Sequence, residues 1–137
     1  MNTARRPRDM GQTLVEFVMV APLFFALLVG VIEGGRYAFY AQHLHHATRE
    51  GARYQVVHGS ASLDPTGPPD GADIKQAVID AATVFVLEPD DIQLDWNPNN
   101  NHRGTTITVS AAYTFQPIIA LFGPLTVTAE SSLVINN

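Results

Sequence analysis

The stretch D-M-G-Q-T-L-V-E-F places a glycine, Gly11, five residues before a carboxylate, Glu16, at the start of an apolar run. A cut after Gly11 would leave Gln12 as a new N-terminus, whose ammonium group lies one helical turn from Glu16. A carboxylate inside a membrane helix costs at least a few kcal/mol unless it has a partner. Glu16 would therefore neutralise this amine, in its own chain or in a neighbouring subunit. Alternatively, Glu16 lies near enough to the helix end to reach headgroup water.

Two further groups of polar side chains could bind a metal ion. The histidines of residues 43–46 (H-L-H-H) precede Glu50, but only His46 and Glu50 are in phase on a helix, and no H-E-x-x-H motif is present. The aspartates of residues 90–95 lack the D-x-D-x-D-G pattern of a calcium loop. We interpret the histidines as surface or head contacts and the aspartates as a solvated turn, and we predict no metal and no cofactor.

Composition excludes several classes of function. The chain has 137 residues, 46% of them hydrophobic and 15% charged, which allows one ordered domain and an accessory segment. The sequence contains eight Lys and Arg residues and thirteen Asp and Glu residues, and it has no basic stripe after residue 53. Nucleic acid is therefore not an expected partner. Without cysteine, P-loop, G-x-S-x-G or dinucleotide motif, the sequence predicts no enzyme and no small-molecule substrate.

Residues 14–32 carry no charge except Glu16, and as a helix they would measure roughly 28 Å, close to the thickness of a bilayer core. Arginines precede this run, at residues 5, 6 and 8, which predicts a cytoplasmic N-terminus and one membrane span. A cleaved signal peptide is the alternative. The apolar run is longer than is usual for such a peptide, and no small-x-small cleavage site follows it.

The same helix is predicted to continue to Val57 and to carry two packing faces. Small residues recur every four positions at Ala26, Gly30, Gly34 and Ala38, forming a ridge that another helix can approach closely. The alternative is that Gly34 and Gly35 bend or end the helix. Beyond the membrane, a stripe at three- and four-residue spacing predicts packing along one side of the helix. The stripe comprises Tyr37, Tyr40, Leu44, Ala47, Gly51 and Tyr54.

Residues 11–53 combine G-Q-x-L-V-E-F, Pro22, a Glu33-to-Arg36 patch and the closing R-E-G-A-R. This segment, 43 of 137 residues, resembles the TadE-like minor pseudopilins of tight-adherence (Flp-type) pilus and secretion systems. The resemblance implies a leader over residues 1–11 that a prepilin peptidase removes, and a spine helix over residues 12–57 that contacts other pilins or pseudopilins. It also implies an assembly role, a single span in the bacterial inner membrane, a periplasmic or extracellular head, and incorporation into a pilus.

The rest of the chain predicts a small α+β head. Residues 58–72 are predicted to form a loop and residues 73–137 the head. The head is predicted to begin with a helix whose N-cap is Asp70 or Asp73. Pro89 is expected to end this helix after Glu88. One face of this helix would carry Ile74, Val78, Ala81 and Phe85.

Three alternating stretches then predict a three-stranded antiparallel meander. Residues 116–124 (Q-P-I-I-A-L-F-G-P) are expected to close the core rather than to form an exposed patch. The apolar faces of the strands comprise Ile92, Leu94 and Trp96; Ile107, Val109, Ala111, Tyr113 and Phe115; and Leu125, Val127 and Ala129.

Two other functions stay open at this point. An uncleaved, membrane-tethered envelope protein with a ligand- or partner-binding head would keep its N-terminus and would not need Glu16. A secreted enzyme or metal-binding domain would be released from the membrane and would bind metal at the histidines of residues 43–46 or at the aspartates.

Overall fold

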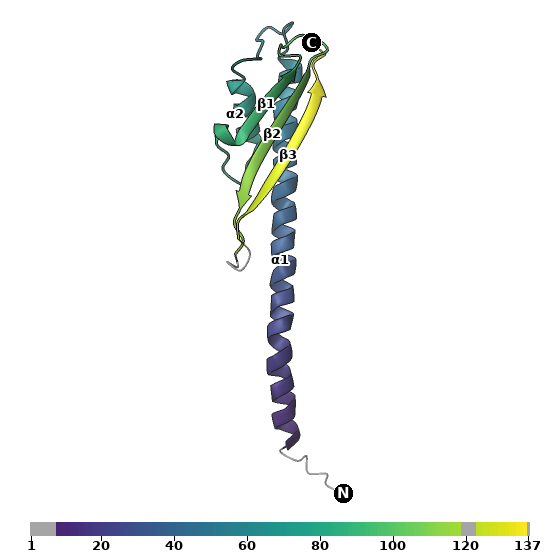
Figure 1. Ribbon diagram of the computed structural model, residues 1–137, viewed down its shortest axis with the longest axis vertical. Helices are drawn as coiled ribbons and strands as arrows, with labels where there is room; N and C mark the ends of the chain where they lie inside the picture. The colour runs from purple at the N-terminus through teal and green to yellow at the C-terminus, as the bar shows by residue number, and fades with distance from the viewer. Residues whose placement is uncertain (1–7, 119–122, 137) are drawn as a thin grey trace. The chain divides into compact units, whose positions relative to one another are not determined.

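The computed structural model describes residues 8–118 and 123–136. Two helices are followed by three strands, which confirms the predicted α+β class with a long N-terminal helix and a three-stranded antiparallel sheet (Figure 1). The chain divides into two compact units, Met1–Arg36 and Tyr37–Asn137, and the second is called the head below. The elements are α1 (Arg8–Val57), α2 (Ala72–Ala81), the short 3-10 helix η1 (Pro89–Asp91), β1 (Ile92–Asn97), β2 (Thr106–Phe115) and β3 (Leu125–Val134).

Helix α1 has 50 residues and ends at Val57, as predicted. It contains Pro22, whose ring removes one backbone hydrogen bond; membrane helices tolerate such a loss when neighbouring groups compensate for it. The helix also continues through Gly34 and Gly35. The alternative in which this glycine pair ends the helix is therefore wrong.

The sheet has the order β1-β2-β3 with antiparallel neighbours, which confirms the predicted meander. Its register places Leu94 opposite Val109 and Ala111 opposite Ala129, so that the alternating apolar residues share one face. That face is buried in one core together with residues of α1 and α2. Fully buried members of this core include Leu44 and Ala47 from α1, Ile74 and Val78 from α2, and Ile107 and Val109 from β2.

The start of α2 differs from the prediction. The N-cap is Gly71, in the left-handed conformation at φ 52° and ψ 21°, and not Asp70 or Asp73. A Cβ at Gly71 would lie 2.5 Å from Leu94 Cδ1 and 2.9 Å from Trp96 Cη2, so glycine is required both for the backbone angle and for the close approach to β1. Asp73 instead lies in the first turn, where a carboxylate suits the helix dipole.

The end of α2 also differs, because the helix stops at Ala81 rather than at Glu88. The segment T-V-F-V that follows is rich in β-branched residues, which lose rotamer freedom in a helix. This segment is not helical, and the ring of Phe85 packs against those of Tyr40 and Tyr113, at centroid distances of 5.7 and 4.5 Å. The free energy gained by burying the ring of Phe85 therefore exceeds the free energy that one more turn of α2 would contribute.

The expectation that residues 116–124 close the core stays a prediction. Residues 119–122 lie outside the described residues, and Ile118 is 72% exposed. The leader predicted over residues 1–11 likewise falls mostly outside the part that the structure describes.

Candidate functional site

The first unit exposes its apolar side chains. Phe17 is 69% exposed, Met19 75% and Leu23 72%, and none of the large apolar residues in the described range 11–36 is buried. Such exposure is unfavourable in water and natural in lipid. Among the described residues, α1 is the one helix long and apolar enough to cross a bilayer. These observations indicate membrane anchoring through α1.

The predicted processing residues lie at the beginning of α1. Gly11 and Gln12 fall in its first turns, and Glu16 is exposed one turn further on. The first four backbone N–H groups of a helix lack intrahelical partners, which gives this end a partial positive charge. After a cut at Gly11, the ammonium of Gln12 and the carboxylate of Glu16 would be i, i+4 neighbours on one helix face. The carboxylate would also favour the positive end of the helix dipole.

The small-residue ridge is open in the first unit. A Cβ added at Gly30 or Gly34 would meet nothing within 4 Å, so packing within the chain does not require glycine at either position. Ala26 is exposed as well, and so is Ala38, which belongs to the head. The ridge therefore presents backbone to whatever lies beside α1, which is the arrangement that close helix pairing uses.

The heptad-like stripe has a different environment. Leu44 and Ala47 are fully buried in the core of the head, and the ring of Tyr40 stacks on that of Tyr113 at 5.6 Å. A Cβ at Gly51 would lie 2.3 Å from Val78 Cγ2, so this glycine allows α2 to approach α1. The structure thus places the stripe against the sheet and α2 of its own chain. Tyr37, the first residue of the stripe, contacts the ring of Phe115 at 5.9 Å.

A buried glutamine was not singled out from the sequence. Gln55 is fully buried in α1 and donates from Nε2 to the carbonyl of Thr66 at 2.9 Å. Its Oε1 accepts from Trp96 Nε1 at 3.2 Å, so one side chain connects α1, the loop after it and β1. Gln55 follows Gly51 by four residues and so continues the spacing of Leu44, Ala47 and Gly51. A polar residue at such a core-facing position is the signal in the sequence that could have indicated a buried, hydrogen-bonded side chain.

The candidate metal-binding side chains do not converge. The ring of His43 lies 4.4 Å from that of Phe39, whereas His45 and His46 are exposed. Asp91 Oδ2 accepts the backbone N–H of Glu88 at 3.0 Å, which is a capping role in η1. Within residues 8–118 and 123–136, no group of three or more His, Cys, Asp or Glu is placed to hold a metal ion.

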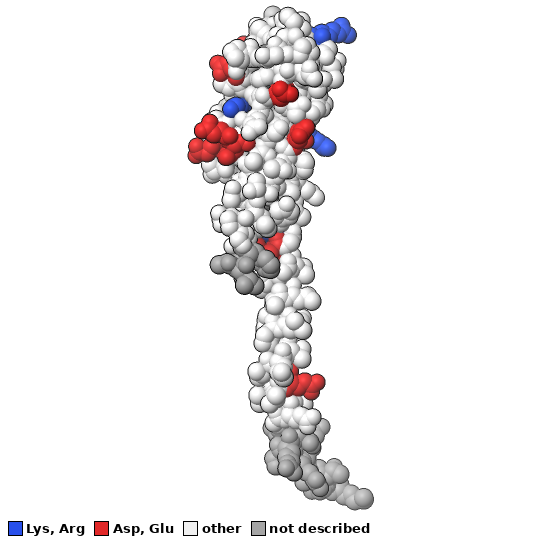
Figure 2. All heavy atoms as spheres, in the orientation of Figure 1, with Lys and Arg blue, Asp and Glu red and all other residues white. Residues whose placement is uncertain are grey.

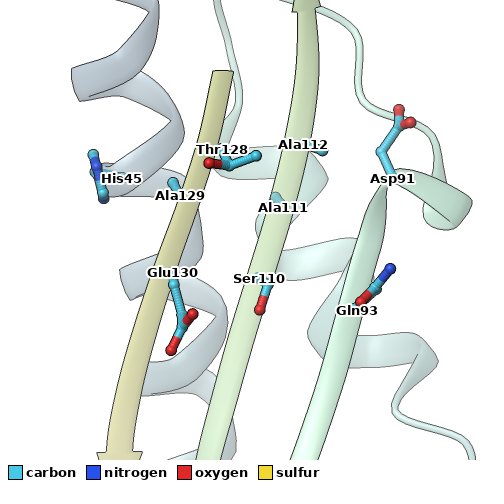
Figure 3. A pocket seen from close by; sticks show the side chains of 9 residues that line it. All are labelled: His45, Asp91, Gln93, Ser110, Ala111, Ala112, Thr128, Ala129 and Glu130. Atoms are coloured by element: carbon cyan, nitrogen blue, oxygen red, sulfur yellow. The ribbon is translucent and has the colours of Figure 1, made fainter. Parts of the chain in front are cut away.

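A hollow of about 430 Å³ lies over the sheet, and Figure 3 shows the side chains around it. Its polar residues are spread over separate elements: His45 comes from α1, Gln93 from β1, Ser110 from β2 and Glu130 from β3. In the close-up these side chains lie apart from one another instead of converging on a common point (Figure 3). The residues that line the hollow thus hold no nucleophile against a base.

Fold and site together define the class: an α+β protein with a single N-terminal helix suited to membrane anchoring. The family model described as TadE-like protein matches residues 11–53. The match begins at the predicted processing glycine, ends at Arg53, and confirms the resemblance of this segment to TadE-like proteins of the tight adherence system. Comparisons with curated proteins and with solved structures give no match.

Proposed function

We propose that this protein is a minor pseudopilin, an assembly component of a tight-adherence pilus or a related secretion system. The observation that carries the proposal is the coincidence, on one TadE-like helix, of Gly11, the exposed Glu16 and an open ridge at Gly30 and Gly34. A prepilin peptidase would cut after Gly11, and α1 would then enter a bundle of similar helices. The protein would perform no reaction of its own.

Each part of α1 would have its own task in this assembly. The ammonium of Gln12 and the carboxylate of Glu16 would neutralise each other, within one chain or between neighbours, which lowers the cost of holding either charge near the lipid. The ridge would let a second helix approach closely enough for backbone contact. The head, on the periplasmic or extracellular side, would set the position of the subunit and contact other components.

The ridge supplies a direct test because two adjacent glycines differ in their position around the helix. Gly34 lies in the ridge, whereas Gly35 lies about 100° away around the helix. At both positions a Cβ would meet nothing within 4 Å, so the two substitutions start from equally open positions. Gly34→Leu is expected to reduce helix–helix association about tenfold, since interhelical contacts in membranes contribute roughly 1–2 kcal/mol.

The measurement is disulfide cross-linking, in native membranes, of a single cysteine introduced at Ala26. The chain contains no cysteine, so every cross-linked product reports this site alone. The matched control, Gly35→Leu, should cross-link as the parent does. Equal cross-linking of the Gly34→Leu and Gly35→Leu variants would refute the ridge as an assembly face.

A further inference from the structure

One end of the head exposes large apolar side chains. Val86 is 82% exposed, Ile118 72%, Phe39 51% and Leu125 47%, although each of these residue types is usually buried. Together with Tyr37, which is 39% exposed, these residues are called the head base. Leu63, Val57 and Val134 are exposed as well, so the connection of this end to the apolar run at Tyr37, and not exposure alone, sets it apart.

Contacts within the head place these residues at the same end. The ring of Tyr37 lies 5.9 Å from that of Phe115, the last residue of β2, and the sheet register sets Phe115 opposite Leu125. Ile118 follows Phe115 by three residues. On the other side, Val86 follows Phe85, whose ring lies 5.7 Å from that of Tyr40 in the same part of α1.

The segments that form this end carry no formal charge. Residues 37–48, 81–87, 106–118 and 123–129 contain no Asp, Glu, Lys or Arg. Figure 2 shows the acidic side chains of the head gathered mainly on one side of it, and the sequence places Glu88 two residues after Val86 and Arg36 directly before Tyr37, so charges border these segments. Charged groups at such a border can stay in headgroup water while the uncharged segments meet lipid, which avoids the desolvation cost of burying a charge.

Chain connectivity limits how far one residue of this end, Tyr37, can lie from the bilayer. Only residues 33–36 separate Ile32, the last residue of the apolar run, from Tyr37. A helix rises about 1.5 Å per residue, so Tyr37 lies within roughly 10 Å of the bilayer core, whatever direction the head takes. The headgroup region has a similar depth, which leaves no room for a thick water layer at Tyr37.

We propose that the head base is a lipid-contacting surface that lies in the interface of the bilayer that α1 spans. This inference rests on the membrane span of the proposed function and adds a second membrane contact to it. Aromatic residues such as Tyr37 and Phe39 favour the level of the headgroups, and Val86, Ile118 and Leu125 favour the acyl boundary just below.

The experiment is a depth measurement on the full chain in vesicles of phosphatidylcholine and phosphatidylglycerol. Because the chain has no cysteine, single-cysteine variants carry one nitroxide label each. Val86→Cys and Ile118→Cys report on the head base, and both side chains are exposed, so the substitutions should not disturb folding. Phe24→Cys marks the membrane span, and Arg103→Cys marks the loop between β1 and β2 at the opposite end of the head.

The labels are compared by their collision rates with oxygen, which concentrates in lipid, and with a water-soluble nickel chelate. At Val86 and Ile118 the oxygen-to-nickel ratio is expected to exceed that at Arg103 by at least about fivefold and to approach the ratio at Phe24. A ratio equal to that at Arg103 would overturn the proposal. Low collision rates with both reagents would overturn it as well, and would indicate a protein contact.

The span control separates this proposal from the one on which it rests. A water-like ratio at Phe24 would refute the membrane span, and with it both the proposed function and the lipid contact. A lipid-like ratio at Phe24 with water-like ratios at Val86 and Ile118 would refute the lipid contact alone.

Discussion

Replacing Glu16 with glutamine is expected to reduce incorporation of this protein into pili or basal complexes by at least about tenfold, while membrane insertion is unchanged. The substitution leaves the size of the side chain nearly constant and removes its charge, so the ammonium of Gln12 would lose its partner near the lipid. Insertion depends on the apolar run and should not need the carboxylate. The amount of protein in purified assemblies, relative to that in the membrane, measures the effect.

A second carboxylate on α1 provides the matched control for Glu16. Glu33 lies at the other end of the apolar run, where its carboxylate accepts a 2.9 Å hydrogen bond from Arg36. Glu33→Gln therefore removes the same charge from the same helix without affecting the new N-terminus. Incorporation of the Glu16→Gln variant at the level of the Glu33→Gln variant would refute the role that we assign to Glu16.

The second large effect concerns the stability of the head. Gln55→Ala should lower the free energy of unfolding by roughly 2 kcal/mol, because it leaves the indole N–H of Trp96 without its partner at Gln55 and removes one of the two side-chain donors to the carbonyl of Thr66, the other being Asn101. For a domain of about 100 residues, this loss corresponds to a fall in Tm of roughly 10 °C. The fluorescence of Trp96, the single tryptophan in the sequence, reports the transition directly.

The control for Gln55 is another glutamine of the same helix. Gln42 is exposed, and Gln42→Ala should change stability by less than about 0.5 kcal/mol. Thermal unfolding of both variants in the same detergent, as full-length chains, makes the comparison. A melting temperature for Gln55→Ala within the range of the Gln42→Ala variant would show that the hydrogen bonds of Gln55 do not stabilise the head.

Regular hydrophobic periodicity explains what the sequence predicted well. Ile107, Val109 and Ala111 alternate with polar residues over a complete strand, and the observed burial follows that alternation. The extent of α1 was also predictable at its C-terminal end, because the stripe continues to Tyr54 before the glycine-rich loop begins. Local patterns of this kind act over the whole element, so tertiary contacts seldom reverse them.

The errors occurred where one long-range contact decided the local structure. Asp70 and Asp73 both have the side chain of a good N-cap, yet Gly71 occupies that position because Leu94 and Trp96 lie too close for a Cβ. Helical spacing extends to Phe85, yet its ring is placed by Tyr40 and Tyr113, far away in the sequence. Neither contact is visible in a window of ten or fifteen residues.

For the candidate site, the sequence predicts processing at Gly11, a charge role for Glu16 and a packing ridge on α1, and these stay predictions, whereas it did not reveal Gln55. Gly11, Glu16 and the ridge could be proposed from the sequence because each is a local pattern of residue type and spacing within one helix. The role of Gln55 depends on Trp96, which is 41 residues away, and on the loop that contains Thr66. Its buried hydrogen bonds follow from the tertiary fold rather than from the helix itself.

The most direct test of the proposed function is the N-terminal residue and intact mass of the protein extracted from its native membrane. A chain that begins at Gln12 is the predicted result, because it shows cleavage after Gly11 and leaves an ammonium group one turn from Glu16. A chain that begins at Met1 or Asn2 would contradict prepilin-type processing and leave Glu16 without the partner that defines its role.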